Sequence, residues 1–213
     1  SQCHLPAKDP QILRGHTAVV TPDREALLAR LSMVKPQLAN TRFDFVEREA
    51  YVEATCPWGN VIRCYAPDAE RFGRIVLGIP YVELNVPVGT ATPIAAFYQQ
   101  AFRTEANVEE DAQGRFARVT VGTKQYLVFR ETDKPQAEYD GHHIQIYVAD
   151  FSGPHRWLLD KGLITEESDQ HQYRFKDIVD PETRKHLFTL EHEVRSLKHP
   201  LYGRPLVNRN PVQ

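Results

Sequence analysis

Three evenly spaced segments of this chain resemble one another, and this internal repeat constrains the fold more than any other feature of the sequence. Each segment opens on glycine and continues as a strand-like run: GHTAVV at 15–20, GIPYVELNV at 78–86 and GHHIQIYVAD at 141–150. Aligned on His16, Tyr81 and His143, the segments lie 65 and 62 residues apart. In a chain without low-complexity sequence, such spacing indicates a repeated structural unit.

A helix signal follows each of the three strands. Thr21 and Thr92 each precede a proline, which is typical of a capped helix start, and Ser152 can cap the third helix. Apolar residues such as Phe97 and Tyr98 then recur at helical spacing. β-rich stretches separated by turn residues come after each helix. Each unit is therefore predicted to be β-α-β-β-β.

Composition and charge exclude several classes of protein. The 213 residues include 26 Lys and Arg and 28 Asp and Glu, a net charge of −2, so no global basic field favours nucleic acid or a membrane surface. No run approaches the roughly 18 apolar residues that cross a membrane. Three scattered cysteines and no visible signal peptide favour a cytoplasmic protein. Without a P-loop or a GxGxxG fingerprint, we expect no nucleotide cofactor.

Two further motifs, taken with the repeat, carry a resemblance to a known family. The first strand of each unit is here called its head strand. In the first and third units it begins near a histidine that is followed seven residues later by an aspartate, at 16–23 and 143–150, and a Pro-x-Gly-Asn turn occupies 57–60. In this order and spacing they resemble the vicinal oxygen chelate superfamily, the group of glyoxalases, bleomycin-resistance proteins and extradiol dioxygenases. The resemblance extends from Ser1 to about Ser196. It implies an α+β fold in which repeated β-α-β-β-β modules pair into cupped, mostly antiparallel sheets.

The same resemblance implies three parts in the chain. Residues 1–76 would be the C-terminal part of a first domain whose preceding module is missing. The reason is that SQCHLP at the amino terminus matches IRCYAP at 62–67, which is the last or closing strand of the first unit, so it looks like the closing strand of a preceding unit. Residues 77–197 would form a second, complete domain, and 198–213 an extended proline-rich tail. The sheet edge left by the missing module favours either that module or a second copy of the chain as a partner.

Members of this family often hold a divalent metal in the cup, which makes Fe²⁺, Mn²⁺, Zn²⁺ or Ni²⁺ the expected cofactor. Carried over position by position, His143 matches a ligand on the head strand, and either Thr189 or Glu191 takes the position of the glutamate on the closing strand. The chain departs from the pattern at Tyr81 and Arg63, which stand at ligand positions. Since tyrosine is a poor ligand for Mn²⁺ or Zn²⁺, the full four-ligand set is not present.

Strand alternation indicates a polar surface independently of the family. Side chains two residues apart share a face, so His143, Gln145 and Tyr147 oppose an apolar set on the third head strand. By the same reasoning Glu83 and Glu191 lie on polar faces. We assign metal binding to His143 and Glu191, catalysis to Glu83, His171 and Tyr147, and substrate binding to Tyr81 and Gln145. The run at 169–174, which is dense in polar and aromatic residues, adds Gln172, Tyr173 and Arg174 as substrate-binding residues.

Two classes of function fit these residues. The first, which the clustering of histidine and glutamate favours, is a glyoxalase- or dioxygenase-like enzyme whose metal chelates and activates a small oxygen-rich or aromatic substrate. Isomerase, lyase and ring-cleaving dioxygenase chemistry all begin in this way. The second, which Tyr81 favours, is a metal-free protein that binds or sequesters a small molecule. If Glu191 is not a metal ligand, it pairs with an arginine such as Arg130 or Arg174.

Overall fold

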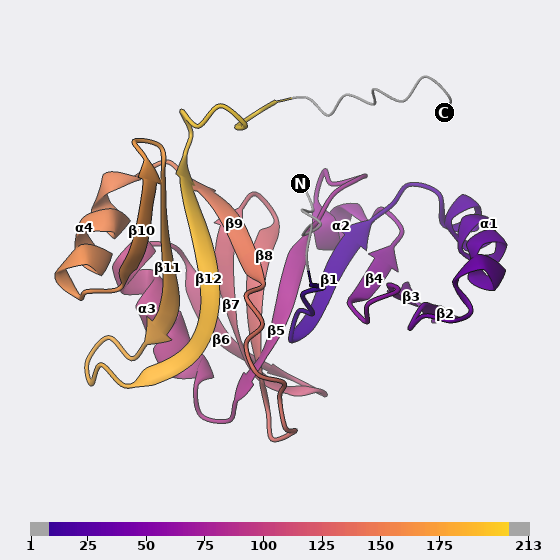
Figure 1. The fold of residues 1–213 in the computed structure, drawn as a ribbon, viewed down its shortest axis with the longest axis horizontal. Helices are drawn as coiled ribbons and strands as arrows, with labels where there is room; N and C mark the ends of the chain where they lie inside the picture. The colour runs from indigo at the N-terminus through magenta and orange to yellow at the C-terminus, as the bar shows by residue number, and fades with distance from the viewer. Residues whose placement is uncertain (1–8, 205–213) are drawn as a thin grey trace. The chain divides into compact units, whose positions relative to one another are not determined.

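The structure, a computed structural model, describes residues 9–204 and contains the predicted β-α-β-β-β unit three times (Figure 1). The fold is α+β, consisting mostly of strands with few helices, as the sequence predicted. The described residues form two compact units. One comprises residues 9–142 with 177–190, and the other comprises 143–176 with 191–204.

The first unit contains an eight-stranded sheet built from two modules. The first module consists of β1 (Gly15–Val20), α1 (Arg24–Val34), the 3-10 helix η1 (Lys35–Leu38), β2 (Asp44–Glu47), β3 (Val52–Thr55), β4 (Val61–Tyr65) and the short α2 (Ala69–Phe72). The second consists of β5 (Tyr81–Pro87), α3 (Ala91–Phe102), β6 (Ala106–Asp111), β7 (Gly114–Gly122) and β8 (Gln125–Thr132). The strand order is β2-β3-β4-β1-β5-β8-β7-β6, so the head strands β1 and β5 are neighbours at the centre.

The junction between β1 and β5 is short, antiparallel and tightly packed. Three residue pairs are in register, and one of them places His16 opposite Glu83. Gly15 permits the close approach, because a Cβ atom there would lie 1.9 Å from the carbonyl oxygen of Glu83. This pairing joins strands from both sides of the domain boundary expected at residue 77. The division into domains at 1–76 and 77–197 stays a prediction.

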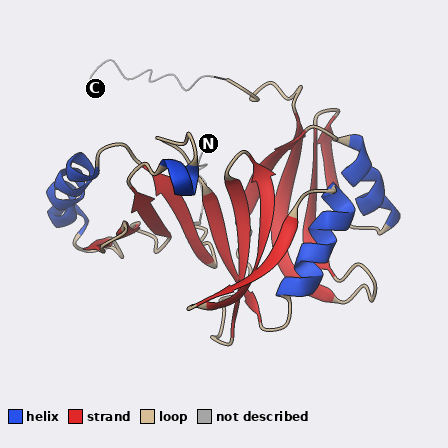
Figure 2. Ribbon diagram, turned by 180° about the vertical axis from the view of Figure 1, so that it is seen from behind, coloured by secondary structure: helices blue, strands red, loops and turns tan. Residues whose placement is uncertain are grey.

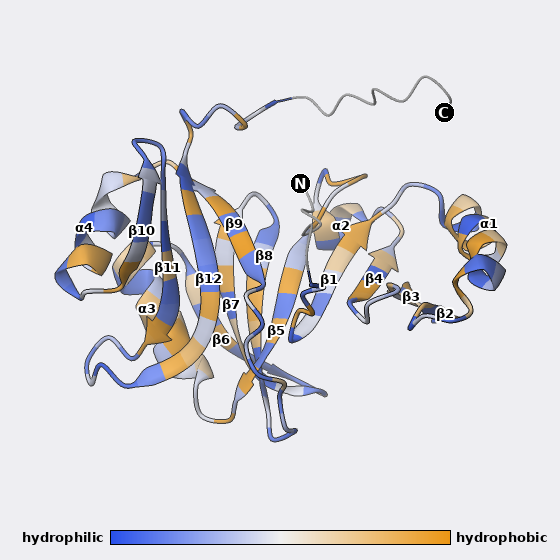
Figure 3. Ribbon diagram, in the orientation of Figure 1, coloured by the Kyte–Doolittle hydropathy of each residue, from blue (hydrophilic) through white to orange (hydrophobic). Residues whose placement is uncertain are grey.

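Helix α3 packs against one face of the strands of its own module. It packs against β6, β7 and β8 (Figure 2), and its side chains Ile94, Phe97 and Tyr98 are buried. The Tyr98 ring lies 5.5 Å from that of Phe129 on β8. Burying a side chain of this size contributes roughly 1.5–3 kcal/mol, so this face is the core of the unit. Hydrophilic and hydrophobic bands alternate along β5, as one buried and one polar face require (Figure 3).

Helix α1 is properly capped but buries none of its residues. Its N-cap is Asp23 rather than the predicted Thr21, and the Asp23 carboxylate accepts a hydrogen bond from the Ala26 N–H. Figure 1 shows α1 beyond β2 and β3, at the end of the sheet away from α3. The leucines of α1 are therefore only partly covered, in contrast to the apolar side of α3.

The third module forms a separate sheet; its residues 143–176 and 191–196 belong to the second unit, and its segment 177–190 belongs to the first. Its elements are β9 (His143–Val148), α4 (Ser152–Asp160), β10 (Ile164–Asp169), β11 (Gln172–Val179) and β12 (His186–Ser196). The order is β10-β11-β12-β9, and β9 and β12 run parallel. On the apolar side, Phe175 stacks on the buried ring of His192 with centroids 4.2 Å apart, and Leu158 of α4 is completely buried. The other side of the sheet carries polar residues.

The predictions for the two ends of the chain are tested only in part. The closing strand expected at the amino terminus and residues 205–213 of the expected proline-rich tail lie outside the described residues. Leu201 is partly buried, while Tyr202 is half exposed with its ring 5.1 Å from that of Tyr147. Between residues 9 and 204, the helices are too short or too polar to span a membrane.

Candidate functional site

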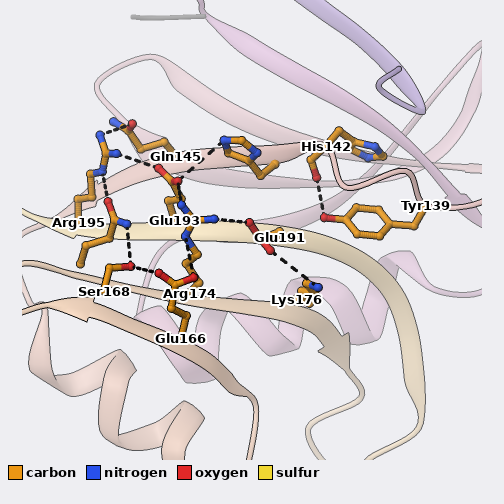
Figure 4. A network of polar contacts seen from close by, with 12 residues as sticks. Tyr139, His142, Gln145, Glu166, Ser168, Arg174, Lys176, Glu191, Glu193 and Arg195 are labelled. Carbon is orange, nitrogen blue, oxygen red and sulfur yellow. Dashed lines mark hydrogen bonds and ion pairs between the residues drawn. The ribbon is translucent and has the colours of Figure 1, made fainter. Parts of the chain in front are cut away.

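The polar face of the sheet in the second unit brings several of the predicted site residues together (Figure 4). His143 and Gln145 on β9 lie in register with Glu191 and Glu193 on the parallel strand β12. Arg174 reaches the same face from β11. Alternation explains this placement, because residues two apart on a strand point to the same side.

Arg174 lies at the centre of this polar network. Its guanidinium donates to Glu191 at 2.7 Å and also to Glu193, and its Nε atom lies 3.7 Å from Glu166 on β10. His143 Nε2 is 3.9 Å from Glu193 Oε1. Both carboxylates beside His143 therefore already have an arginine partner.

A second arginine, Arg195, completes the network. It donates to Gln172 at 2.6 Å, to Glu193 at 2.9 Å and to Gln145. Arg195 and Glu193 are 6% and 3% exposed. Charges that deep persist only when they are paired and hydrogen-bonded, so each of these two residues depends on the other.

The polar face is electrically balanced. Three carboxylates, from Glu166, Glu191 and Glu193, face three cations, from Arg174, Lys176 and Arg195. Lys176 is the most distant of the cations, 4.0 Å from Glu191. The face is therefore strongly polar but close to neutral, so it attracts neither an anion nor a cation over distance.

A divalent metal fits these residues poorly. Zn²⁺ requires free oxygen or nitrogen ligands at about 2.0–2.2 Å, but Glu191 and Glu193 already accept hydrogen bonds from Arg174. Among residues 9–204, no group of three or more His, Cys, Asp or Glu side chains is arranged to hold a metal ion. The guanidinium of Arg174 stands where a metal cation would compete for the same oxygens.

The other predicted residues of the second unit lie around this network. His171 Nδ1 is 3.3 Å from the Ser196 hydroxyl. The ring of Tyr147 packs against the tail rather than against the charged groups. Tyr173 is adjacent to Arg174 on β11, so its side chain points to the opposite side of the sheet, toward α4.

Glu83 and Tyr81 lie in the first unit, in a buried cluster at the β1·β5 junction. Glu83 Oε1 is 3.1 Å from Arg130 Nε and 3.7 Å from His16 Nδ1. Tyr81 Oη is 3.4 Å from His16 Nε2 and 2.8 Å from Tyr65 Oη. His16 and Glu83 are 5% and 8% exposed. The first unit thus has its own polar centre.

Burial controls the ionisation of this cluster. Burial, together with the positive charges of Arg63 and Arg130, lowers the pKa of His16 to about 3, so the imidazole is uncharged at neutral pH. Burial raises the pKa of Glu83 above its ordinary value, although Arg130 and Arg63 oppose the shift. Burial raises the pKa of Tyr81 as well, and the phenol stays protonated. With so low a pKa the imidazole is a weak base at neutral pH, and it serves here as a neutral polar contact between a carboxyl group and a phenol.

Glu193, Arg195 and Arg130 are polar-site residues that the sequence pattern does not single out. Glu193 and Arg195 lie two and four residues after Glu191, so strand alternation could have placed their side chains on the same face as that of Glu191. Arg130 enters the sequence analysis only as a possible partner of Glu191, whereas in the structure it pairs with Glu83. The identity of an ion-pair partner depends on tertiary contacts that alternation does not specify.

Solved structures share this architecture, although their sequences are distant. Glyoxalase I from Zea mays superposes with a TM-score of 0.54 at 13% identity, covering 85% of this chain and 66% of that one. A variant of the same enzyme gives 0.55 at 14% identity, with the same coverage. A provisionally assigned dioxygenase from Bacillus subtilis gives 0.52 at 17% identity, covering 86% and 62%. This chain therefore spans slightly less than two thirds of the length of those structures.

These similarities establish the architecture of the chain. It has the vicinal oxygen chelate fold, as the sequence resemblance predicted. No family model and no curated protein matches the sequence. At such low identity a shared fold does not determine an activity, so the function has to be argued from the residues of the site.

Proposed function

We propose that this chain is a small-molecule-binding protein with the vicinal oxygen chelate fold, and that it binds its ligand without a metal ion on the polar face of β9–β12. The observation that carries the proposal is Arg174, which holds both carboxylates next to His143. A metal ion would have to displace the guanidinium from Glu191 and Glu193. Leaving a charged group unpaired in a partly buried site is costly.

The balanced charges of this face favour an uncharged, oxygen-rich ligand. Its oxygens would accept hydrogen bonds from Arg174 and Lys176, and its hydroxyl groups would donate to Glu191. The exposed fraction of these side chains, 26%, 46% and 15% respectively, leaves their outer atoms accessible. Such a ligand adds hydrogen bonds without having to separate the existing ion pairs.

A metal-dependent, glyoxalase- or dioxygenase-like enzyme is the second candidate. It is favoured by the register of β9 and β12, which sets His143 beside Glu191, and by the names of the similar structures. For this function, Arg174 would have to release Glu191 before Fe²⁺, Mn²⁺, Zn²⁺ or Ni²⁺ could bind. Association as a homodimer, or with a further module, is a separate proposal that sedimentation analysis would test.

Metal titration distinguishes the two candidates. Calorimetric titrations with Zn²⁺ and Mn²⁺ would compare the wild type with His143→Ala and with His186→Ala, a control at an exposed histidine. The metal-free proposal predicts the same weak or absent binding in all three proteins. Stoichiometric binding that disappears only in His143→Ala would establish the enzyme candidate instead.

Ligand titration tests the face itself. Catechol, which carries two neighbouring hydroxyl groups, serves as the probe in buffer containing EDTA. We expect binding that Arg174→Gln weakens about tenfold, since charge-assisted hydrogen bonds are lost. Arg156→Gln on the exposed side of α4 is the matched control and should bind like the wild type. Binding that requires a metal, or that ignores Arg174→Gln, would contradict the proposal.

A further inference from the structure

Strand β9 lies at the outer edge of its sheet. In the order β10-β11-β12-β9 it pairs with β12 alone among the described strands. The first unit differs, because the corresponding head strands β1 and β5 pair with each other at the centre of the eight-stranded sheet. The third module therefore presents, on the outer side of β9, the edge that the other two modules cover with each other.

The other sheet edges in the described part of the chain carry acidic side chains. Strands β2, β6 and β10 each lie at the end of a sheet. Each contains at least two carboxylates: Asp44 and Glu47 on β2, Glu109, Glu110 and Asp111 on β6, and Glu166, Glu167 and Asp169 on β10. Charges on an edge strand oppose pairing with another chain. These three edges are therefore protected against the addition of a strand.

Strand β9 has no such protection. Its sequence, HIQIYV, contains no aspartate, glutamate, lysine, arginine or proline. Ile144 and Val148, on its apolar side, are only partly buried. An uncharged edge strand with unpaired backbone groups is a template for a further strand. The contrast with β2, β6 and β10 indicates that the outer side of β9 is an interface.

The pairing of β1 with β5 gives the register for such an interface. Thr17 lies opposite Val82. Each of them is one residue after the position at which the three head strands align, and the equivalent residue of β9 is Ile144. Because Thr17 and Val82 occupy equivalent positions, an approximate two-fold axis passes between them. The axis of an interface between two copies of β9 would pass between their Ile144 residues, as a symmetric dimer requires.

The side chains of β9 match one another in this register. Ile144 faces Ile144 of the second copy on the apolar side, and His143 faces Gln145 on the polar side. Gln145 Oε1 accepts a hydrogen bond from Arg195, so the Gln145 amide nitrogen is the group that donates toward the imidazole of the facing His143. The facing side chains thus bring no like charges together, and like charges directly opposite are what would destabilise such a pair.

The pairing is short. Gly15 lets β1 approach β5 closely, because a Cβ atom there would lie 1.9 Å from the carbonyl oxygen of Glu83. His142 stands at the equivalent place before β9 and carries a side chain. Two β9 strands therefore pair over residues 143–145 only. This gives three residue pairs, as many as join the two modules of the first unit.

We propose that two copies of this chain associate through β9, whose strands pair antiparallel about a two-fold axis at Ile144. The association joins the two four-stranded sheets into one continuous sheet. It goes beyond the proposed function, because it needs no ligand and is measured without one. It also sets the polar faces of the two copies side by side, with His143 of each copy next to Gln145 of the other.

Sedimentation equilibrium without ligand measures the association. The mass of one chain is 24.5 kDa, and we expect the wild type to show twice this mass at high concentration. Ile144→Lys should raise the dissociation constant about tenfold or more, since two like charges then face each other and two isoleucines lose burial. Ile164→Lys places the same charge on β10, at the opposite edge of the same sheet, and should leave the constant unchanged. A wild type that is monomeric at every concentration, or equal effects of the two variants, would overturn the proposal.

Ile144→Cys tests the register without adding a charge, and it covers the case in which Ile144→Lys does not fold. In an antiparallel pair the Cα atoms of facing residues are about 4.5–5.5 Å apart, within the range that a disulfide spans. Oxidation in air with copper phenanthroline should therefore convert this variant to a covalent dimer, as two thiols form one disulfide and oxygen takes up their electrons and protons. Ile164→Cys is the matched control, and the wild type accounts for the native cysteines. Covalent dimer in none of the three proteins, or to the same extent in all of them, would contradict the pairing at Ile144.

Discussion

The two units place charge at the centre of a sheet in opposite ways. In the first unit, burial keeps His16 uncharged beside Glu83, so the β1·β5 junction relies on a neutral imidazole. In the second unit, Glu191 and Glu193 both pair with the guanidinium of Arg174. The same fold therefore tolerates buried polar groups either by suppressing a charge or by neutralising it with a partner.

This difference determines how each unit responds to a perturbation. A site that depends on a neutral imidazole is sensitive to pH, because acid adds a charge that burial disfavours. A site that depends on ion pairs is sensitive to loss of a partner, because the remaining charge is stranded. The four predictions below test this contrast by altering one unit at a time.

Arg174→Gln should have the largest effect, and it acts on the second unit. Removing Arg174 costs about 3 kcal/mol of unfolding free energy, the lower end for a buried ion pair, because the guanidinium is partly exposed and Glu193 keeps Arg195 as a partner; urea denaturation would measure the loss. The variant should also gain affinity for Zn²⁺, because Glu191, Glu193 and His143 are then accessible to a metal. Zn²⁺ should therefore raise the melting temperature of the variant and not that of the wild type.

Arg156→Gln is the control for this prediction, since it removes an arginine from the exposed side of α4. Its stability should stay within about 0.5 kcal/mol of the wild type, and Zn²⁺ should not affect it. If Zn²⁺ stabilises the wild type as strongly as Arg174→Gln, the guanidinium is not what opposes metal binding.

His16→Gln should flatten the pH dependence of the first unit. The pKa of His16 is about 3 in the folded chain against an ordinary value of 6.5. Between these values the folded chain binds fewer protons than the unfolded chain, so stability falls as the pH drops from 6.5 toward 3. The loss at pH 4 is on the order of 3 kcal/mol. Glutamine takes up no proton, so urea denaturation of the variant should show a smaller slope.

The control for the pH experiment is His186→Gln, which replaces an exposed histidine of β12. Its stability should follow the same pH dependence as the wild type. A His16→Gln profile that coincides with the wild type would mean that His16 is protonated without penalty, and the contrast between the units would disappear.

Gly15→Ala tests the junction itself. The added Cβ atom would meet the backbone of β5 at 1.9 Å, so the strands must separate. Overpacking of this kind costs about 1–3 kcal/mol. Hydrogen exchange should accelerate at the amides of Thr17 and Val82, which face each other across the junction, while amides of β9 and β12 keep their wild-type rates. Unchanged exchange at Thr17 would show that the junction absorbs the methyl group.

Tyr81→Phe should have the smallest effect. It removes a hydroxyl that contacts His16 and Tyr65 at 3.4 and 2.8 Å, and the loss of a hydrogen bond of this kind costs about 1 kcal/mol. Thermal denaturation would measure the change. A loss much larger than this would mean that the phenol organises the whole cluster rather than one contact.

Periodic features of the sequence predict the fold well. The repeat at His16, Tyr81 and His143 gives three β-α-β-β-β units, and alternation places Glu191 and Gln145 on one polar face. These features depend on short-range geometry, which is the same wherever a strand occurs.

The contacts of the candidate site are less predictable. Alternation places Glu191 on a polar face but does not show that Arg174 rather than Arg130 is its partner. The sequence predicts a helix after the first strand, but it does not show that α1 has no buried side chain among the described residues.

The antiparallel pairing of β1 and β5 relates two similar modules by a half-turn at the centre of their sheet. Here one side presents the neutral imidazole of His16 and the other the carboxyl group of Glu83. The half-turn therefore relates the backbones of the two modules but not their side chains, and burial shifts the pKa values of the two facing groups in opposite directions.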